Sequence, residues 1–194
     1  MIRLMLTVLL LLSPAVAETW FVSTVLQRPG GFVTSQEWGS QPDSLPEGWR
    51  QTPTRIVIHH AGVNWVEGTD PYTKVRNLQA WGKREKGWPD LPYHFLISPD
   101  GRIFEGRDPS YQPQSNTDYE MKGVLNVQLF GNFEEQSVSP EQKQALISLL
   151  RYLCDSYSIP SERISTHQRE APGQTTCPGK DLVRCLPEIL SGLN

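Results

Sequence analysis

The sequence predicts an α/β fold, a single domain in which helices flank a central mixed β-sheet. Residues 55–60 form a short β-branched run, which is typical of a strand buried on both faces. Predicted elements follow in the order strand, helix, hairpin, strand, helix, strand, helix. This order indicates a mixed sheet with helices packed against it. A chain of 194 residues is long enough for one sizeable core without a disulfide scaffold.

The first half of the chain contributes a helix and a hairpin. Asp70 supplies an N-cap, and Pro71 takes the first helical position of a helix that ends by Gly87. Residues 93–98 and 102–105 then alternate as strands around the turn 99–101, whose sequence Pro-Asp-Gly is typical of a hairpin.

The second half repeats the strand-helix pattern. Residues 124–130 are predicted to form a strand, and Ser139 with Gln142 forms a capping box that starts the clearest helix of the chain. That helix ends before Pro160. A short strand is expected at 164–167 and a last helix at 180–190, which Pro187 would shorten or kink.

The N-terminus predicts export. Residues 1–17 contain a basic Arg3, an apolar run too short to span a bilayer and a small-x-small cleavage signal, so they read as a signal peptide. We expect residues 18–53 to form an irregular segment packed on the domain and residues 54–194 to form the domain itself. The mature protein would be periplasmic or extracellular.

Composition excludes several classes of partner. With 18 Lys and Arg against 21 Asp and Glu, the formal net charge is -3, so no basic field is available for nucleic acid or for an anionic membrane surface. No second long apolar run follows the signal peptide, which predicts that the protein has no membrane anchor. We expect a monomer.

Histidine and cysteine are the residues that suggest metal chemistry. His59, His60, His167 and Cys177 offer the imidazole and thiolate donors that zinc prefers. Their spacing matches no local zinc motif, so the fold would have to assemble the site. Adjacent strand residues point to opposite faces, so His59 and His60 should not bind the same ion, and the pattern does not choose between them.

Six motifs occur in the order seen in one family. They lie at residues 34–40, 55–60, 87–95, 100–107, 129–133 and 175–179. On these motifs the chain resembles the type 2 N-acetylmuramoyl-L-alanine amidases, whose fold is shared by peptidoglycan recognition proteins and phage T7 lysozyme. The resemblance runs from about residue 34 to residue 186.

The resemblance implies a Zn²⁺ site held by His59, His167 and Cys177. It also implies that Tyr93 and Thr175 stabilise the oxyanion of a tetrahedral intermediate. The purely structural alternatives are an inward strand aromatic for Tyr93 and a brace of its turn for Thr175. Gln128 stands where some of these amidases carry a catalytic Glu, so that strand supplies no carboxylate base.

Two further residues are candidates for substrate binding. By the same resemblance His60 would lie beside the substrate groove, although a histidine buried behind the strand fits the pattern as well. Arg107 would meet a stem-peptide carboxylate or, alternatively, form a surface ion pair.

The implied function is hydrolysis of peptidoglycan or of soluble muropeptides. A water activated by zinc would attack the amide between N-acetylmuramic acid and the L-alanine of the stem peptide. A non-catalytic peptidoglycan-binding module is the alternative, and the presence of Cys177 favours the enzyme. A thiol enzyme with Cys177 as nucleophile and His167 as base is a third reading, which leaves the first-strand histidine without a role.

The remaining two cysteines suggest a disulfide. Cys154 and Cys185 lie beside the apolar stripes of the two C-terminal helices, and an oxidising compartment favours their pairing. The alternative is two buried thiols that act as small apolar side chains.

Overall fold

The computed structural model describes residues 31–193, so the predicted signal peptide lies outside the described residues. A single six-stranded sheet in the order β1-β4-β3-β5-β2-β6 forms its centre. Its strands are β1 Phe32–Val33, β2 Arg55–His60, β3 Phe95–Ile97, β4 Ile103–Glu105, β5 Val124–Leu129 and β6 Ile164–Thr166. Among these six strands, the β3–β4 pair is antiparallel and the other neighbouring pairs are parallel. The predicted mixed sheet is confirmed.

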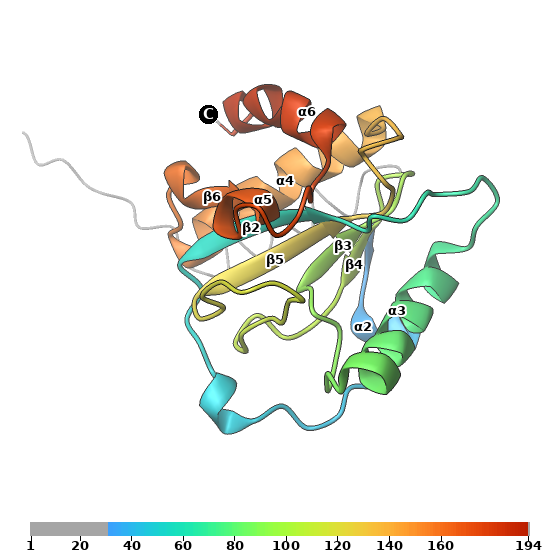
Figure 1. The fold of residues 1–194 in the computed structure, drawn as a ribbon, viewed down its shortest axis with the longest axis vertical. Coiled ribbons are helices and arrows are strands. Elements are labelled where there is room, and N and C mark those ends of the chain that lie inside the picture. Colours follow the sequence, from blue (N-terminus) through green and yellow to red (C-terminus); the bar gives the residue numbers. More distant parts are fainter. Residues whose placement is uncertain (1–30, 194) are drawn as a thin grey trace, which may run out of the picture.

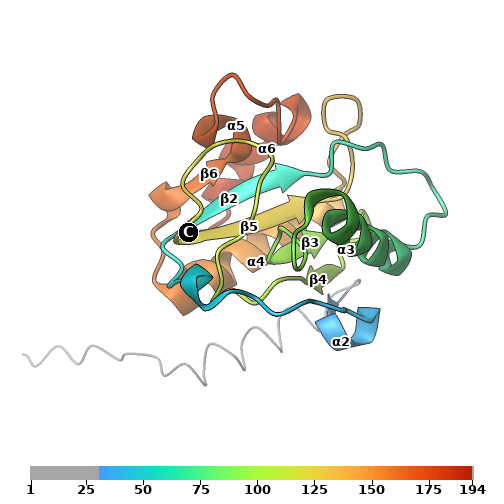
Figure 2. The ribbon, with the colours of Figure 1, turned by 60° about the horizontal axis from the view of Figure 1, so that its bottom comes forward.

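Helices cover both faces of the sheet. They are α2 Ser35–Trp38, α3 Pro71–Lys86, α4 Pro140–Tyr157, α5 His167–Glu170 and α6 Lys180–Ser191, with short 3₁₀ turns at Glu47–Trp49 and Ser161–Arg163. In Figure 1, α4 and α6 lie on one side of the strands, while α2 and α3 lie on the other. Figure 2 shows the same layers with α3 in front of the sheet and α4 behind it.

The two long helices begin and end where the sequence predicts. The Asp70 side chain accepts hydrogen bonds from the backbone of Tyr72 and Thr73, and Gly87 ends α3 in the left-handed conformation. Ser139 and Gln142 form both hydrogen bonds of a capping box at the start of α4. These local bonds satisfy backbone groups that a helix end otherwise leaves without partners.

The main core lies between the sheet and the α4–α6 layer. Its buried residues include Ile56 and Ile58 of β2, which pack with Leu146 and Leu149 of α4 and Leu182 of α6. Because alternate strand residues point to opposite faces, this packing directs Val57 and His59 toward the other side of the sheet. The second, smaller apolar cluster lies there, around α2 and α3.

Residues 31–53 are more ordered than the predicted irregular segment. β1 pairs with β4 at the edge of the sheet, and a capping box between Thr34 and Glu37 starts α2. Trp38 is fully buried, and its Nε1 donates to the Glu105 carbonyl at 2.6 Å. This segment therefore contributes a strand and a core residue to the domain instead of merely lying on it.

The short strand before the last loop is one residue shorter than predicted. β6 ends at Thr166, and His167 is the first residue of α5. The chain thus turns into a helix at His167, with its side chain on the face of the sheet that also holds His59.

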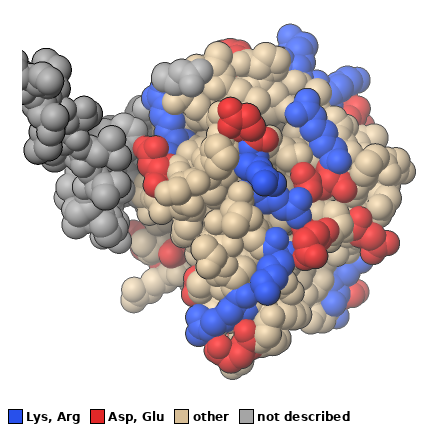
Figure 3. All heavy atoms as spheres, turned by 90° about the vertical axis from the view of Figure 1, so that its left-hand side faces the viewer, with Lys and Arg blue, Asp and Glu red and all other residues tan. Residues whose placement is uncertain are grey.

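The charged surface and the lengths of the helices bear on the predicted partners. On the face drawn in Figure 3, Lys and Arg lie interspersed with Asp and Glu. Between residues 31 and 193, every helix is too short or too polar to cross a bilayer.

Candidate metal centre

His59, His167 and Cys177 meet at one end of β2. One donor atom from each lies within 4.8 Å of the others, and all three residues are buried. Cys177 Sγ is 3.7 Å from His59 Nδ1, and the two imidazole ring centroids are 4.5 Å apart. The fold therefore assembles the three residues that spacing alone did not connect.

His59 is held by a neighbour on the adjacent strand. Its Nε2 lies 3.0 Å from Oδ1 of the buried Asn126 on β5. That contact occupies the ring nitrogen on the far side from Cys177, so Nδ1 faces the cluster. Burial and the nearby His167 lower the pKa of His59 well below its usual value, which keeps the imidazole neutral.

His167 is held by the loop between β4 and β5. Its Nε2 lies 2.6 Å from Thr117 Oγ1 and 3.3 Å from Ser115 Oγ. This loop crosses the strands toward α5 in Figure 2. Burial lowers the pKa of His167 to about 4, so this ring is neutral as well. Neutral imidazoles are the form that binds a metal ion.

The Cys177 thiol has the wrong pKa for a free nucleophile. Burial raises its pKa to about 12, and the backbone N–H of His60, which donates to Sγ at 3.3 Å, only partly opposes this. Thiol enzymes need a lowered thiol pKa. The reading with Cys177 as nucleophile and His167 as base is therefore disfavoured, whereas a bound cation would deprotonate the thiol outright.

Tyr93 lies against the cluster. Its ring centroid is 5.3 Å from that of His59 in an edge-on arrangement. Burial raises the pKa of Tyr93, and the nearby Cys177 raises it further, so the phenol keeps its proton at neutral pH. The Tyr93 backbone packs closely against Gly106. A side chain at residue 106 would not fit, because its Cβ would lie 2.3 Å from the Tyr93 carbonyl oxygen.

Thr175 braces the loop that carries Cys177. Its Oγ1 accepts a hydrogen bond from the Cys177 backbone at 3.1 Å. The side chain is partly exposed, and its hydroxyl proton is still free to be donated. The bracing contact and the oxyanion contact inferred from the resemblance are therefore compatible.

His60 points away from the cluster. It is 8% exposed, and its Nδ1 accepts a hydrogen bond from the Phe133 backbone at 3.2 Å. Phe133 belongs to the core beneath α4 and α6. The structure therefore favours the alternative in which this histidine is buried behind the strand.

Arg107 is neither a surface ion pair nor an exposed binding group. It is fully buried, and its guanidinium donates to the Gln112 carbonyl at 2.8 Å, to Gln114 Oε1 at 2.6 Å and to the Asp90 carbonyl at 3.2 Å. Burial lowers its pKa to about 10. The predicted contact with a stem-peptide carboxylate and the alternative surface ion pair are therefore both wrong. The guanidinium instead binds two backbone carbonyls and the Gln114 side chain inside the protein.

The predicted disulfide is also corrected. Cys154 and Cys185 are free thiols, and both pack against the main core. Burial raises the pKa of Cys154 to about 11 and also raises that of Cys185. The two cysteines lie in the same core layer, but this does not by itself give the narrow geometry that a disulfide requires. They act here as small apolar side chains.

The cluster fits a zinc ion. Two imidazoles and one thiol are donors that zinc prefers, and three protein ligands leave a fourth tetrahedral position open. Nε2 of each histidine lies within hydrogen-bond distance of a neighbouring side chain, as the non-ligating nitrogen of a metal-bound histidine commonly does. The donor types, their mutual distances and their neighbours thus agree.

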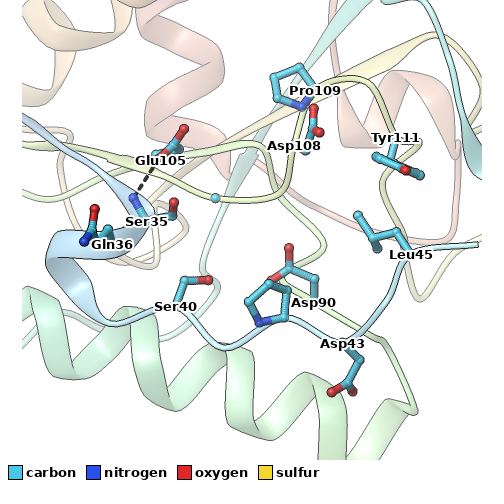
Figure 4. Close-up of a pocket in the computed structure, with 12 residues that line it drawn as sticks. Ser35, Gln36, Ser40, Asp43, Leu45, Asp90, Glu105, Asp108, Pro109 and Tyr111 are labelled. Carbon is cyan, nitrogen blue, oxygen red and sulfur yellow. Dashed lines mark hydrogen bonds between the residues drawn. The ribbon is translucent and has the colours of Figure 1, made fainter.

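A separate pocket of about 660 Å³ lies beside the N-terminal segment. Figure 4 shows it between residues 35–45 and the loop that follows β4, with Asp43, Asp90, Glu105 and Asp108 on its walls. Glu105 accepts from the Ser35 backbone at 2.7 Å, and Lys83 pairs with Asp43 at 2.7 Å. None of the residues predicted for the metal centre lines this pocket.

Sequence reasoning missed the residues that surround the donors. Asn126, Thr117 and Ser115 hold the two histidines, and the ring of Tyr119 lies 5.5 Å from His167. One signal was visible in the sequence. Asn126 and Gln128 alternate with apolar residues in β5, so they place two polar side chains on one face of a buried strand.

Comparison with known proteins gives consistent matches. A family model described as N-acetylmuramoyl-L-alanine amidase matches residues 49–180. Peptidoglycan-recognition protein SC2 of Drosophila simulans is 28% identical over 151 residues, which cover 77% of this chain and 81% of that protein. Peptidoglycan recognition protein 4 of Mus musculus is 31% identical over 148 residues, covering 74% of this chain and 39% of that protein.

Solved structures show the same fold. The N-acetylmuramoyl-L-alanine amidase LysC from Clostridium intestinale is 27% identical, with a TM-score of 0.68 over 84% of this chain and 97% of that one. Drosophila peptidoglycan recognition protein SD is 24% identical, with a TM-score of 0.70 over 82% and 94%. The family model spans more than half of the sequence and the expected resemblance is confirmed, so this chain belongs to the N-acetylmuramoyl-L-alanine amidase family.

Proposed function

We propose that this protein is an exported zinc amidase that cleaves the bond between N-acetylmuramic acid and the L-alanine of peptidoglycan stem peptides. The observation that carries the proposal is the buried cluster of His59, His167 and Cys177, with donor atoms within 4.8 Å of one another. The family match supports the substrate class. Residues 1–17 would direct export and be cleaved off, so the mature enzyme would act in the periplasm or outside the cell, where peptidoglycan is accessible.

When bound, zinc would activate a water as the nucleophile and polarise the scissile carbonyl. The chain's own residues account for the rest. Tyr93 keeps its phenol proton and lies beside His59, so it can donate to the oxygen that becomes negative in the transition state. Thr175 is a second donor on the Cys177 loop.

A peptidoglycan-binding protein without hydrolysis is the second candidate. The names of the similar curated proteins favour it, since several are peptidoglycan recognition proteins. The buried set of three zinc-type donors favours the enzyme, because binding alone does not require them.

Digestion of purified peptidoglycan and of soluble muropeptides by the mature protein tests the proposal. Mass spectrometry should find free stem peptides that begin with an L-alanine amine, together with intact sugars. A chelator should stop their release and added zinc should restore it. Retention of the protein on peptidoglycan without any released peptide would overturn the amidase and establish the binding module.

A further inference from the structure

Asn126 is the most connected polar residue next to the metal centre. It is fully buried in the middle of β5, a strand hydrogen-bonded on both sides. Its side chain contacts His59, Pro92 and Tyr119, and its backbone contacts His94. No motif and no feature of the proposed chemistry assigns it a role.

The orientation of the Asn126 amide is fixed by Pro92. One amide atom lies 3.2 Å from the Pro92 carbonyl oxygen, which can only accept a hydrogen bond, so that atom is Nδ2. Oδ1 is therefore the atom that lies 3.0 Å from His59 Nε2. The Tyr119 hydroxyl also donates to Oδ1, at 3.4 Å, which is consistent with the same orientation.

An acceptor at this place determines where His59 carries its proton. A neutral imidazole has one N–H, and Oδ1 requires that N–H to be on Nε2. Nδ1 then presents a lone pair toward Cys177, as a metal ligand must. We infer that Asn126 is a positioning residue that holds His59 in the Nε2–H tautomer and so prepares Nδ1 for metal binding. This inference rests on the proposed zinc site.

The same strand position constrains a second histidine through the backbone. The Asn126 N–H donates to His94 Nδ1 at 2.9 Å, and His94 Nε2 lies 2.9 Å from the Tyr111 carbonyl oxygen. His94 must therefore also carry its proton on Nε2. Because this contact uses backbone atoms of residue 126, it survives a change of the side chain and supplies an internal control.

The test measures the ring nitrogens of the metal-free protein by ¹⁵N NMR, together with zinc affinity by competition with a chelator. In the unchanged protein, both His59 and His94 should be Nε2–H tautomers. Asn126→Leu removes the acceptor at similar size. His59 should then become a mixture of tautomers and zinc affinity should fall by about 10- to 100-fold, while His94 stays as it was.

Two further variants complete the design. Asn126→Asp keeps an acceptor for His59 and should keep the Nε2–H tautomer, so the test does not depend on folding of Asn126→Leu. Val124→Ala is the control, because Val124 is fully buried in the same strand. This change should lower the stability of the protein without altering the contacts of His59, and zinc affinity should stay unchanged.

Each failure has a different meaning. Folded Asn126→Leu with unchanged zinc affinity and an unchanged His59 tautomer would overturn the inference, as would a shift of His59 to the Nδ1–H form in Asn126→Asp. If the unchanged protein binds no zinc, the proposed function falls, and the tautomer measurements still decide whether Asn126 orients His59.

Discussion

On one face of the central sheet, Ile56 and Ile58 of β2 pack against the apolar side of α4 and α6. On the other face of the same strand, His59 meets Asn126 and Cys177. The first face is stabilised by the burial of apolar area, and the second consists of buried polar groups that depend on hydrogen-bond partners. Alternation along a single strand thus separates the residues that hold the fold from those that form the site.

The difference between the faces has a practical consequence. Apolar packing is not directional, so a change on the α4–α6 face should alter stability without altering chemistry. The polar face depends on direction, because a hydrogen bond forms only where a donor points at an acceptor. The buried Oε1 of Gln128 has no hydrogen-bond partner among the described residues. An unsatisfied buried acceptor of this kind lowers the stability of the folded protein.

The largest effect is expected on the polar face from Cys177→Ser. A hydroxyl replaces the thiolate donor, so the variant should lose both zinc and amidase activity, whereas the unchanged protein should contain about one zinc per chain. Elemental analysis and muropeptide digestion measure the two losses. Cys154→Ser is the matched control, because Cys154 lies in the other layer and should affect neither. Full zinc content in Cys177→Ser would remove this residue from the site.

On the apolar face, Leu149→Ala should cost stability alone. Leu149 is fully buried in the main core, and truncation of such a leucine destabilises by about 2–5 kcal/mol. Urea unfolding of the metal-free protein measures this loss, and chelator competition should show unchanged zinc affinity. A large loss of zinc affinity in the folded variant would contradict the separation of the two faces.

Tyr93→Phe sharpens the comparison within the polar face. It should retain zinc and lower turnover by about 10²-fold, which is the contribution of one oxyanion donor. Steady-state kinetics should show the loss in kcat. Tyr72→Phe is the control, because Tyr72 packs on Phe104 beside the smaller apolar cluster. If both variants keep the original rate, Tyr93 is only a packing residue.

The smallest effect is a pH dependence of stability in the metal-free protein. Burial lowers the pKa of His94 to about 4, and the hydrogen bond with the Tyr111 carbonyl only partly opposes this. Below about pH 6.5 this histidine takes up a proton in the unfolded chain but not in the folded chain. The contribution of His94 to the free energy of unfolding is therefore complete above about pH 6.5 and is lost as the pH falls toward 4. His59 and His167 act in the same direction. Thermal melts at several pH values should show Tm falling on acidification; a level Tm between pH 7 and 4.5 would contradict the assignment.

Local chemistry in the sequence was sufficient for most elements. Asp70 and Ser139 start the two long helices with side-chain caps, and the Pro-Asp-Gly turn closes the β3–β4 hairpin. These predictions succeeded because each depends on residues within a few positions of one another. The resemblance added the order of the motifs, which identified the family and named the three residues that cluster here.

Only the tertiary structure decided the surroundings of those residues. It placed Arg107 inside the protein, turned His60 toward Phe133 and left Cys154 and Cys185 as free thiols. It also brought Asn126 to His59 and Thr117 to His167 across long stretches of chain. The physical reason is the same in each case. Burial, thiol pairing and hydrogen bonding between distant residues depend on distances set by the packing of the whole sheet, whereas a cap or a turn is determined by its immediate neighbours.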